Sequence, residues 1–329
     1  MLKRLFAYAL VSRSDAAQQN PSVLEARQKP DASGFFNDSF YFSGRDTTGN
    51  ALVLRLGFRP QADTEIWFDL MLPQTGRVSG IFPDATSDIS NITCGPLHLK
   101  CVEPNHLWKI TYNGPVRTSH GDVPAEMELS FSSTEVPVDF KAHTDSWGLA
   151  GYMAQEKWSR EWFEKLRDLK QIHYEQGGTL TGTISLDGTT YPLELRGVRD
   201  HSFGPRKWQA MQEHAWLMAC MEDGSFINVS TVSYDFLPYM HSGYVARGGV
   251  VLPVTAAPRF QDIPRTNPEG MDFQYQFAVK GEPSRRMNCM VDEVFEYTMH
   301  GVYHFYEGLA RFDLDGKKGV GICEIGKLL

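Results

Sequence analysis

The sequence predicts a mainly β protein whose antiparallel sheets are closed into barrels or stacked as sandwiches. Four pairs of apolar runs, each separated by a short turn-forming cluster, predict β-hairpins spread through the chain. The 329 residues suffice for two domains of ordinary size, and a hydrophobic content of 42% suffices for a sizeable core. One strongly amphipathic segment predicts a single long helix in the body.

Residues 1–33 are expected to form a helix and a linker ahead of the first β-domain. The apolar residues at the start have helical spacing and share one face: Leu2, Leu5, Phe6, Ala9 and Leu10. Residues 11–33 are polar and contain two prolines, which is typical of a linker. We expect the segment to dock on the body, with membrane contact through residues 1–13 as the alternative. Removal of residues 1–29 is then expected to leave the fold intact.

Four hairpins account for most of the predicted strands. They span residues 39–58, 179–195, 215–232 and 310–326. Asp187-Gly188 supplies the positive φ of a tight turn in the second hairpin, and Asp223-Gly224 does so in the third. The pattern places one β-domain over residues 34–205 and another over residues 206–329.

The segment 153–169 predicts the long helix. Trp158, Trp162, Leu166 and Leu169 are spaced four, four and three residues apart, so they form one apolar stripe on a helix. Charged residues fill the opposite face. A helix with this pattern is expected to pack on the side of a sheet.

Charge and missing motifs exclude several classes of function. The net charge of -8 argues against a sequence-independent nucleic-acid binder, which needs a basic surface. The chain has no G-x-G-x-x-G after a strand, no P-loop and no G-x-S-x-G elbow, so we expect no nucleotide or other cofactor. It also lacks an apolar run of about 18 residues, so we expect no transmembrane helix.

Cysteine and histidine usage predicts no metal site and a reducing compartment. The five cysteines form no C-x-x-C pair, which suits the cytoplasm better than a disulfide framework. Lys3 and Arg4 precede an apolar run that loosely resembles a signal peptide, so secretion is the minor alternative. His300 and His304 have no matched third ligand, so we expect them to be hydrogen-bonded or solvent-facing.

The stretch GVRDHSFGPRKW, residues 197–208, contains the main candidate residues. It follows the second hairpin directly and presents Asp200 and His201. A histidine has an ordinary pKa near ~6.5 and exchanges protons near neutrality. An adjacent aspartate can orient it, although neighbours on a strand point to opposite faces. The structural alternative is a network in which Arg199 or Arg206 pairs with Asp200 and His201 bonds a carbonyl.

The same stretch resembles the Asp-His-x-Trp-Gly element of the carotenoid hydratases (hydroxyneurosporene synthases) and AttH-like proteins, whose relatives include lipocalin-like cyclases. The matching positions are Gly182, Gly188, Gly197, Asp200, His201 and Gly204, with Phe203 in place of the Trp. Residues 306–326 resemble the closing strands of that family, with Tyr306 in place of a Trp. Residues 213–232 resemble the strands that open its second domain.

The resemblance implies two lipocalin-like β-domains side by side, with an apolar ligand cavity at or near their junction. It implies His201 as a candidate acid that protonates a double bond, with Asp200 as its neighbour. Tyr234 is the nearest candidate for a tyrosine that the hydratases use downstream. The residues expected to bind substrate are Phe203, Arg199, His173, Glu175, Trp216 and Tyr234.

Two classes of function are compatible with these residues. One is an enzyme that binds a bulky apolar isoprenoid- or polyketide-like molecule between the two domains and promotes proton-assisted hydration, isomerisation or cyclisation. The other is a carrier that binds such a molecule without changing it. Polar titratable groups that converge at the ligand indicate the enzyme, and one orienting group in apolar surroundings indicates the carrier.

Overall fold

The computed structural model describes residues 1–12, 20–32, 34–60, 64–83, 91–167 and 171–329. The fold is mainly β, as predicted, and divides into two compact units. The sheet unit comprises Gln18–Pro137 and His173–Gly204, and the barrel unit comprises Met1–Ala17, Val138–Ile172 and Pro205–Leu329. Residues 138–172, which the sequence analysis places in the first domain, therefore group with the C-terminal strands.

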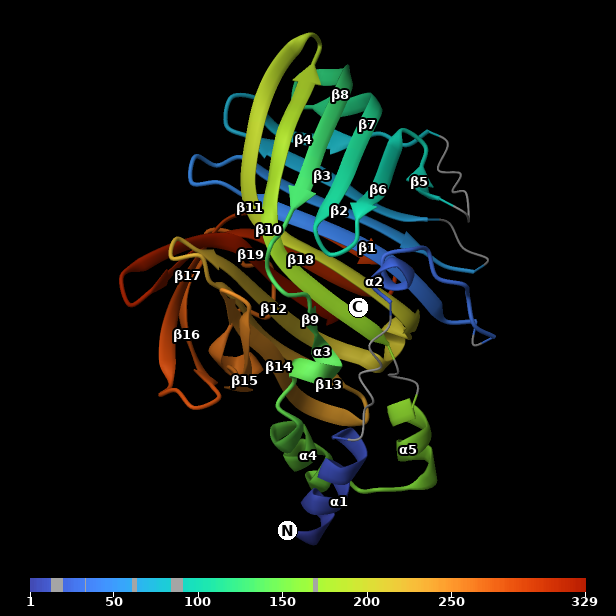
Figure 1. Cartoon of the computed structure of the whole chain (residues 1–329), viewed down its shortest axis with the longest axis vertical. Helices are drawn as coiled ribbons and strands as arrows, with labels where there is room; N and C mark the ends of the chain where they lie inside the picture. The colour runs from blue at the N-terminus through green and yellow to red at the C-terminus, as the bar shows by residue number, and fades with distance from the viewer. Residues whose placement is uncertain (13–19, 33, 61–63, 84–90, 168–170) are drawn as a thin grey trace. The chain divides into compact units, whose positions relative to one another are not determined.

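The sheet unit is an antiparallel sheet preceded by a short helix, α2 (Pro21–Leu24). Its strands are β1 (Phe36–Arg45), β2 (Ala51–Phe58), β3 (Glu65–Leu72), β4 (Gly76–Gly80), β5 (Ile92–Cys94), β6 (Leu97–Glu103), β7 (Leu107–Thr118), β8 (Gly121–Ser132), β10 (Ile172–Leu186) and β11 (Thr189–Pro205). They are ordered β4-β3-β2-β1-β11-β10-β8-β7-β6-β5 (Figure 1). An additional pairing of β4 with β7 joins the two arms of the sheet, so β1, β10 and β11 lie in its middle.

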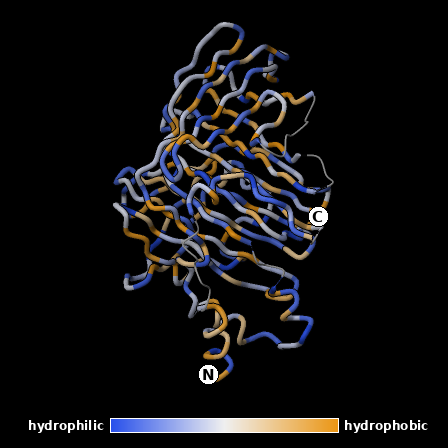
Figure 2. The backbone as a smooth tube through the Cα atoms, turned by 45° about the vertical axis from the view of Figure 1, so that its right-hand side comes forward, coloured by the Kyte–Doolittle hydropathy of each residue, from blue (hydrophilic) through white to orange (hydrophobic). Residues whose placement is uncertain are grey.

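Alternation along the strands builds the core of the sheet unit. On β8, Ala125, Met127 and Leu129 are buried, whereas Glu126 and Glu128 between them are exposed. Figure 2 shows the corresponding alternation of hydrophobic and hydrophilic residues along the backbone. The buried side chains join those of Phe40, Phe42, Trp108, Leu180 and Leu195 in one cluster. At Gly197 an added Cβ would lie 1.8 Å from the Ser43 carbonyl oxygen, so only glycine allows β11 to approach β1 this closely.

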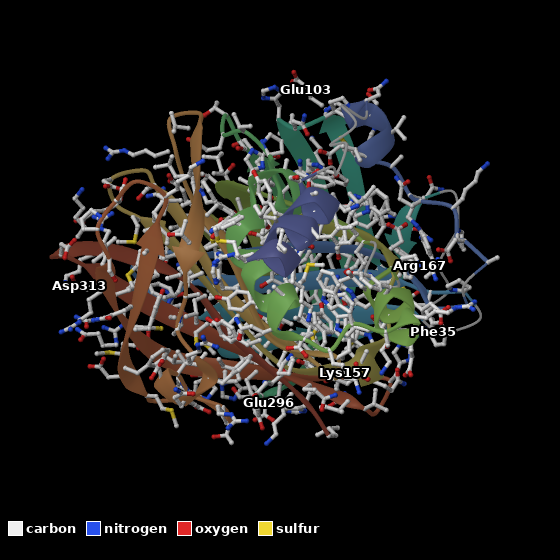
Figure 3. The ribbon with its side chains drawn as sticks, turned by 90° about the horizontal axis from the view of Figure 1, so that it is seen from below. Phe35, Glu103, Lys157, Arg167, Glu296 and Asp313 are labelled. Carbon is white, nitrogen blue, oxygen red and sulfur yellow. The ribbon has the colours of Figure 1, made fainter. Side chains whose placement is uncertain are left out.

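The barrel unit contains a closed antiparallel barrel in the order β12 to β19. The barrel strands are β12 (Met211–Met221), β13 (Phe226–Tyr234), β14 (Leu237–Arg247), β15 (Val250–Ala256), β16 (Asp272–Val279), β17 (Arg285–Met299), β18 (Tyr303–Leu314) and β19 (Lys317–Leu328). The remaining elements of the unit are α1 (Leu2–Val11), β9 (Val138–Asp139), α3 (Phe140–His143), α4 (Ser146–Gln155), α5 (Arg160–Arg167) and the 3₁₀ turns Trp208–Ala210 and Phe260–Asp262. Leu217, Tyr275, Phe277 and Phe312 are among the residues that fill its core. Figure 3 labels one residue on each of two barrel strands, Glu296 of β17 and Asp313 of β18, at the edge of the view.

The four predicted hairpins are confirmed as β1–β2, β10–β11, β12–β13 and β18–β19. Asp187 and Gly188 have φ values of 45° and 82°, and Asp315 and Gly316 have 56° and 87°. Two successive positive φ values are the geometry of a tight two-residue hairpin turn, which aspartate followed by glycine tolerates. Local turn chemistry therefore sets these hairpins.

The helix expected over residues 153–169 is interrupted. The first helix, α4, ends at Gln155, and the second, α5, begins at Arg160. The Trp158 indole donates to the Met153 carbonyl at 2.7 Å, and the Ser159 hydroxyl accepts from the Trp162 amide at 3.1 Å. These two contacts satisfy backbone groups at the end of α4 and the start of α5, so a break costs little here. Of the predicted apolar stripe, Trp162 is buried and Trp158 and Leu166 pack beside it, while Leu169 lies outside the described residues.

The N-terminal residues make two kinds of contact. Helix α1 packs on α4 within the barrel unit and buries Ala7 against Ala150 and Met153. Residues 20–28, which were expected to be part of a linker, contain the short helix α2. Glu25, directly after this helix, is buried in the sheet unit at 2% exposure. The expectation that residues 1–29 can be removed without effect therefore overlooks a buried charge. In the described residues, no helix is long and apolar enough to cross a membrane.

Candidate functional site

The hairpin β10–β11 carries candidate residues on both of its faces. Tyr174, Arg199 and His201 contact residues of the sheet-unit core, and we call this the buried face. His173, Glu175 and Asp200 are their sequence neighbours and form a separate cluster, which we call the His173 face. Alternation of side chains along a strand separates the two sets. The two faces therefore offer different chemistry.

His201 on the buried face has 0% exposure and both of its ring nitrogens are engaged. Its Nε2 lies 2.8 Å from Asp38 Oδ1, and its Nδ1 lies 2.8 Å from the Leu24 carbonyl oxygen. The ring stacks on Phe40 with centroids 3.9 Å apart. Asp38 in turn accepts from Arg27 Nε at 2.8 Å. His201 thus ties β11 to β1 and to the end of α2.

Arg199 forms a second buried ion pair on the same face. Its guanidinium donates to both carboxylate oxygens of Glu25, at 2.6 and 2.9 Å, and to Gln176 Oε1 at 2.9 Å. Glu25 also accepts from the Trp108 indole at 3.0 Å. Arg199 and Glu25 are 1% and 2% exposed, so each charge depends on the other for compensation.

Two further side chains complete the buried face. Tyr174 places its hydroxyl 3.1 Å from His201 Nδ1 and donates to the Leu24 carbonyl at 3.0 Å. Burial of the hydroxyl raises the pKa of Tyr174 far above its usual value, and the nearby Glu25 carboxylate adds to this effect. Phe203 is buried with its ring 5.1 Å from that of His201. These groups form a packed network.

The His173 face brings three of the sequence-predicted residues together. His173 Nε2 bonds directly to the Asp200 carboxylate and lies 3.6 Å from Glu175 Oε1. The side chain of His173 is 30% exposed and that of Asp200 is 12% exposed, whereas Glu175 is fully buried. An accessible imidazole beside two carboxylates is suited to proton transfer.

The same cluster could also hold a metal ion. One ligand atom from each of His173, Glu175 and Asp200 lies within 4.8 Å of the others. One imidazole with two carboxylates is a donor set that first-row divalent cations accept. From the sequence we expect no metal, and the three residues show no recognisable ligand spacing along the chain.

Trp216 and Tyr234 belong to the barrel unit. Trp216 lies on β12 opposite Glu324 of β19. Tyr234 ends β13, where its ring lies 5.8 Å from that of Phe236, and burial raises its pKa. Neither residue is in the same unit as His201, so the structure does not group them with the residues of β10–β11.

The barrel unit contains another histidine–carboxylate pair, which sequence reasoning missed. His214 Nε2 bonds to Glu324, and its Nδ1 lies 2.8 Å from the Tyr303 hydroxyl. Burial by itself would raise the pKa of Glu324, but the attraction of His214, its hydrogen bond and the smaller contributions of Glu307 and Arg206 together lower that pKa. One sequence signal pointed to His214: it lies two residues before the predicted binding residue Trp216, so both side chains share one face of β12.

Glu25, Asp38 and Tyr174 were also missed in the sheet unit. Asp38 had a signal, because the polar run Asn37-Asp38-Ser39 interrupts an otherwise apolar strand. Glu25 had none, since it lies in a segment whose composition is typical of a linker.

His300 and His304, expected to be hydrogen-bonded or solvent-facing, lie in different settings: His300 is exposed and His304 is hydrogen-bonded. His300 lies in the turn before β18 with a φ of 50°, and His304 bonds to Glu296 at 3.0 Å.

Comparison with known proteins identifies the family and the fold. Residues 22–328 match the model of a domain of unknown function, DUF7064, and the chain belongs to this family. A protein assigned as AttH from Nitrosomonas europaea is similar in structure, with a TM-score of 0.53, 13% identity, and coverage of 91% of this chain and 97% of that one. Kievitone hydratase from Nectria haematococca has a TM-score of 0.50 and 12% identity, with coverage of 92% and 91%. The AttH-like fold predicted from sequence is thereby confirmed. A search of curated proteins finds no match.

Proposed function

We propose that this DUF7064 chain is an enzyme that needs no cofactor and moves a proton on a bulky apolar molecule of isoprenoid or polyketide type. The reaction is a hydration, an isomerisation or a cyclisation. His173 and Asp200 exchange the proton, and the buried face positions the strands that carry them. The pairing of a partly exposed His173 with Asp200 is the observation that carries the proposal.

The chemistry follows from these groups. The His173 ring bonds to the Asp200 carboxylate and lies 3.6 Å from Glu175 Oε1, so both carboxylates compensate the positive charge when the ring carries a second proton. That imidazolium donates its proton to one carbon of a double bond, which leaves a cation on the other carbon. Addition of water there, with return of the surplus proton to His173, completes a hydration. Loss of a neighbouring proton to His173 completes an isomerisation. Attack by a second double bond forms a ring bond and moves the cation to a new carbon, and loss of a proton from the carbon next to it, again to His173, completes a cyclisation.

The fold agrees with this class of reaction. A protein named kievitone hydratase has the same fold, so water addition is within the chemistry that the fold accommodates. His201 is an alternative acid on the ground of its motif. Both of its nitrogens are occupied in the core, however, so a proton on it reaches a substrate only if the network opens.

We also propose that the protein works in a reducing compartment, the cytoplasm, since its five cysteines are free thiols. Peripheral contact with lipid through residues 1–13 is part of the proposal.

The test begins with the molecule that accompanies the purified protein, identified by solvent extraction and mass spectrometry. Turnover of that molecule is then measured for His173→Gln, Asp200→Asn and His201→Gln. Exposed His120→Gln is the matched control. We expect His173→Gln to fold normally and to lose roughly 10²-fold or more of the turnover, as for removal of a general acid.

The other outcomes decide between assignments. Loss of turnover in well-folded His201→Gln, with His173→Gln unaffected, would transfer the acid to His201. Tight binding of the molecule with no chemical change in the native protein would identify a carrier instead. Loss of activity on treatment with a chelator, restored by zinc or manganese, would contradict a reaction without cofactor.

A further inference from the structure

Helix α1 exposes an apolar face that the rest of the barrel unit leaves uncovered. Leu2 is 84% exposed, Phe6 57%, Leu5 47% and Leu10 44%, and Trp147 on α4 beside them is 42% exposed. We call these five residues the α1 patch. Single exposed apolar residues are ordinary, but a contiguous group on one helix marks an interaction surface.

The opposite side of α1 explains why the patch stays outward. Helical periodicity places Ala7 and Val11 opposite Leu2 and Leu5, with Phe6 and Leu10 between the two sides, and Ala7 and Val11 pack into the cluster formed with α4. The helix therefore uses one apolar face for docking on its own unit and presents a second one outward. Figure 3 views the end of the barrel unit where α1 lies beside α4.

Basic side chains border the α1 patch on both sides. The Arg4 guanidinium lies over the Trp147 ring at 4.2 Å and donates to the Trp147 carbonyl at 2.9 Å. Lys3 on the other edge places its ammonium 4.9 Å from the Trp158 ring. Exposed Lys157, labelled in Figure 3, is the chain neighbour of Trp158. Two acidic residues belong to the same region. Half-buried Glu156 accepts from the Lys3 ammonium through its carbonyl oxygen, and exposed Glu161 of α5 lies 3.8 Å from Lys165.

This arrangement fits the interface of a lipid bilayer. The aliphatic and aromatic side chains enter the boundary between headgroups and acyl chains, while the basic groups at the rim meet lipid phosphates. Tryptophan at the edge has an apolar body and a polar N–H, which suits the same depth. A protein partner for such a patch would instead need an acidic rim around an apolar groove.

We propose that the α1 patch docks the protein on the surface of a lipid bilayer, from which its apolar substrate is drawn. The inference rests on the proposed function, whose lipid contact it assigns to particular residues and whose substrate it draws from the bilayer. Docking is measured without turnover, so a failure of docking and a failure of the catalytic assignment are distinguished.

The experiment is flotation of the full-length protein with unilamellar vesicles of phosphatidylcholine and phosphatidylserine. We expect the native protein to float with the vesicles. The variant Leu2→Glu/Leu5→Glu should lose roughly tenfold or more of the bound fraction, because it lacks two apolar side chains that the native protein buries in the bilayer. The control is Val250→Glu, which changes a 59% exposed apolar residue on the β14–β15 hairpin and should float as the native protein does. Circular dichroism of the double variant is expected to match that of the native protein.

The same experiment separates the alternatives. His173→Gln should float normally, so a failure of the catalytic assignment leaves docking intact. Equal flotation of native protein and the double variant, or no flotation of either, would overturn the proposal. A dimer of the native protein that the double variant abolishes, without vesicle binding, would assign the patch to a second copy of the chain and would equally overturn it.

Discussion

His201 and His173 lie on adjacent strands of one hairpin, yet their surroundings differ completely. His201 is fully buried between Asp38 and the Leu24 carbonyl, whereas 30% of the His173 side chain is exposed beside Asp200. Each imidazole has an aspartate partner, so the partner alone does not distinguish a structural histidine from a reactive one. The face of the strand does, because it decides whether a substrate can reach the ring.

The comparison also assigns different tasks to two neighbouring residues of one motif. Asp200 faces His173, and His201 faces Asp38, as expected for neighbours on a strand. Mutations on the buried face should therefore affect stability, and mutations on the His173 face should affect proton transfer.

The largest effect is expected from removal of residues 1–29. This deletion leaves Arg199 without Glu25 and Asp38 without Arg27, so buried charges lose their partners. We expect the free energy of unfolding to fall by about 3–5 kcal/mol or more, measured by urea denaturation. Glu25→Gln in the full-length chain should reproduce a large part of the loss. A truncated protein as stable as the native one would show that the buried face does not depend on this segment.

An intermediate effect is expected from the two histidines compared directly. His201→Gln should lower the free energy of unfolding by about 2 kcal/mol, because it disturbs a buried hydrogen bond to a charged partner. His173→Gln should change it by less than about 1 kcal/mol, because its ion pair is partly exposed. Both values come from the same denaturant titrations. Equal losses in the two variants would remove the distinction between the faces.

The smallest effect concerns alkaline pH. The pKa of Tyr174 is raised by burial, so its neutral form is favoured in the folded state. Its contribution to stability is complete below the ordinary tyrosine pKa of about 10 and is lost as pH rises above it. Tyr174→Phe should therefore lose less stability between neutral and alkaline pH than the native protein, in denaturation curves recorded at each pH. Parallel pH dependence of the two proteins would place Tyr174 in contact with water.

Prediction from sequence succeeded where neighbouring residues decide the structure. The four hairpins and the apolar stripe that contains Trp162 depend on local spacing. Asp200 and His201, expected to follow the second hairpin directly, instead lie within its second strand, because β11 continues to Pro205. The helix ends were misjudged because Ser159 and Trp158 cap backbone groups inside a continuous amphipathic pattern. A capping serine three residues before Trp162 was visible in the sequence, but the unbroken stripe outweighed it.

The sequence by itself determined the antiparallel β architecture, the tight turns and the set of histidines and carboxylates available on β10–β11. Turn geometry and alternation act between neighbouring residues, so the chain specifies them locally. Only the tertiary structure decided which histidine is enclosed and which is accessible. The partners of the buried face lie far away in the chain, with Asp38 163 residues before His201 and Glu25 174 residues before Arg199. Contacts over such distances form when the whole sheet closes, and no local pattern records them.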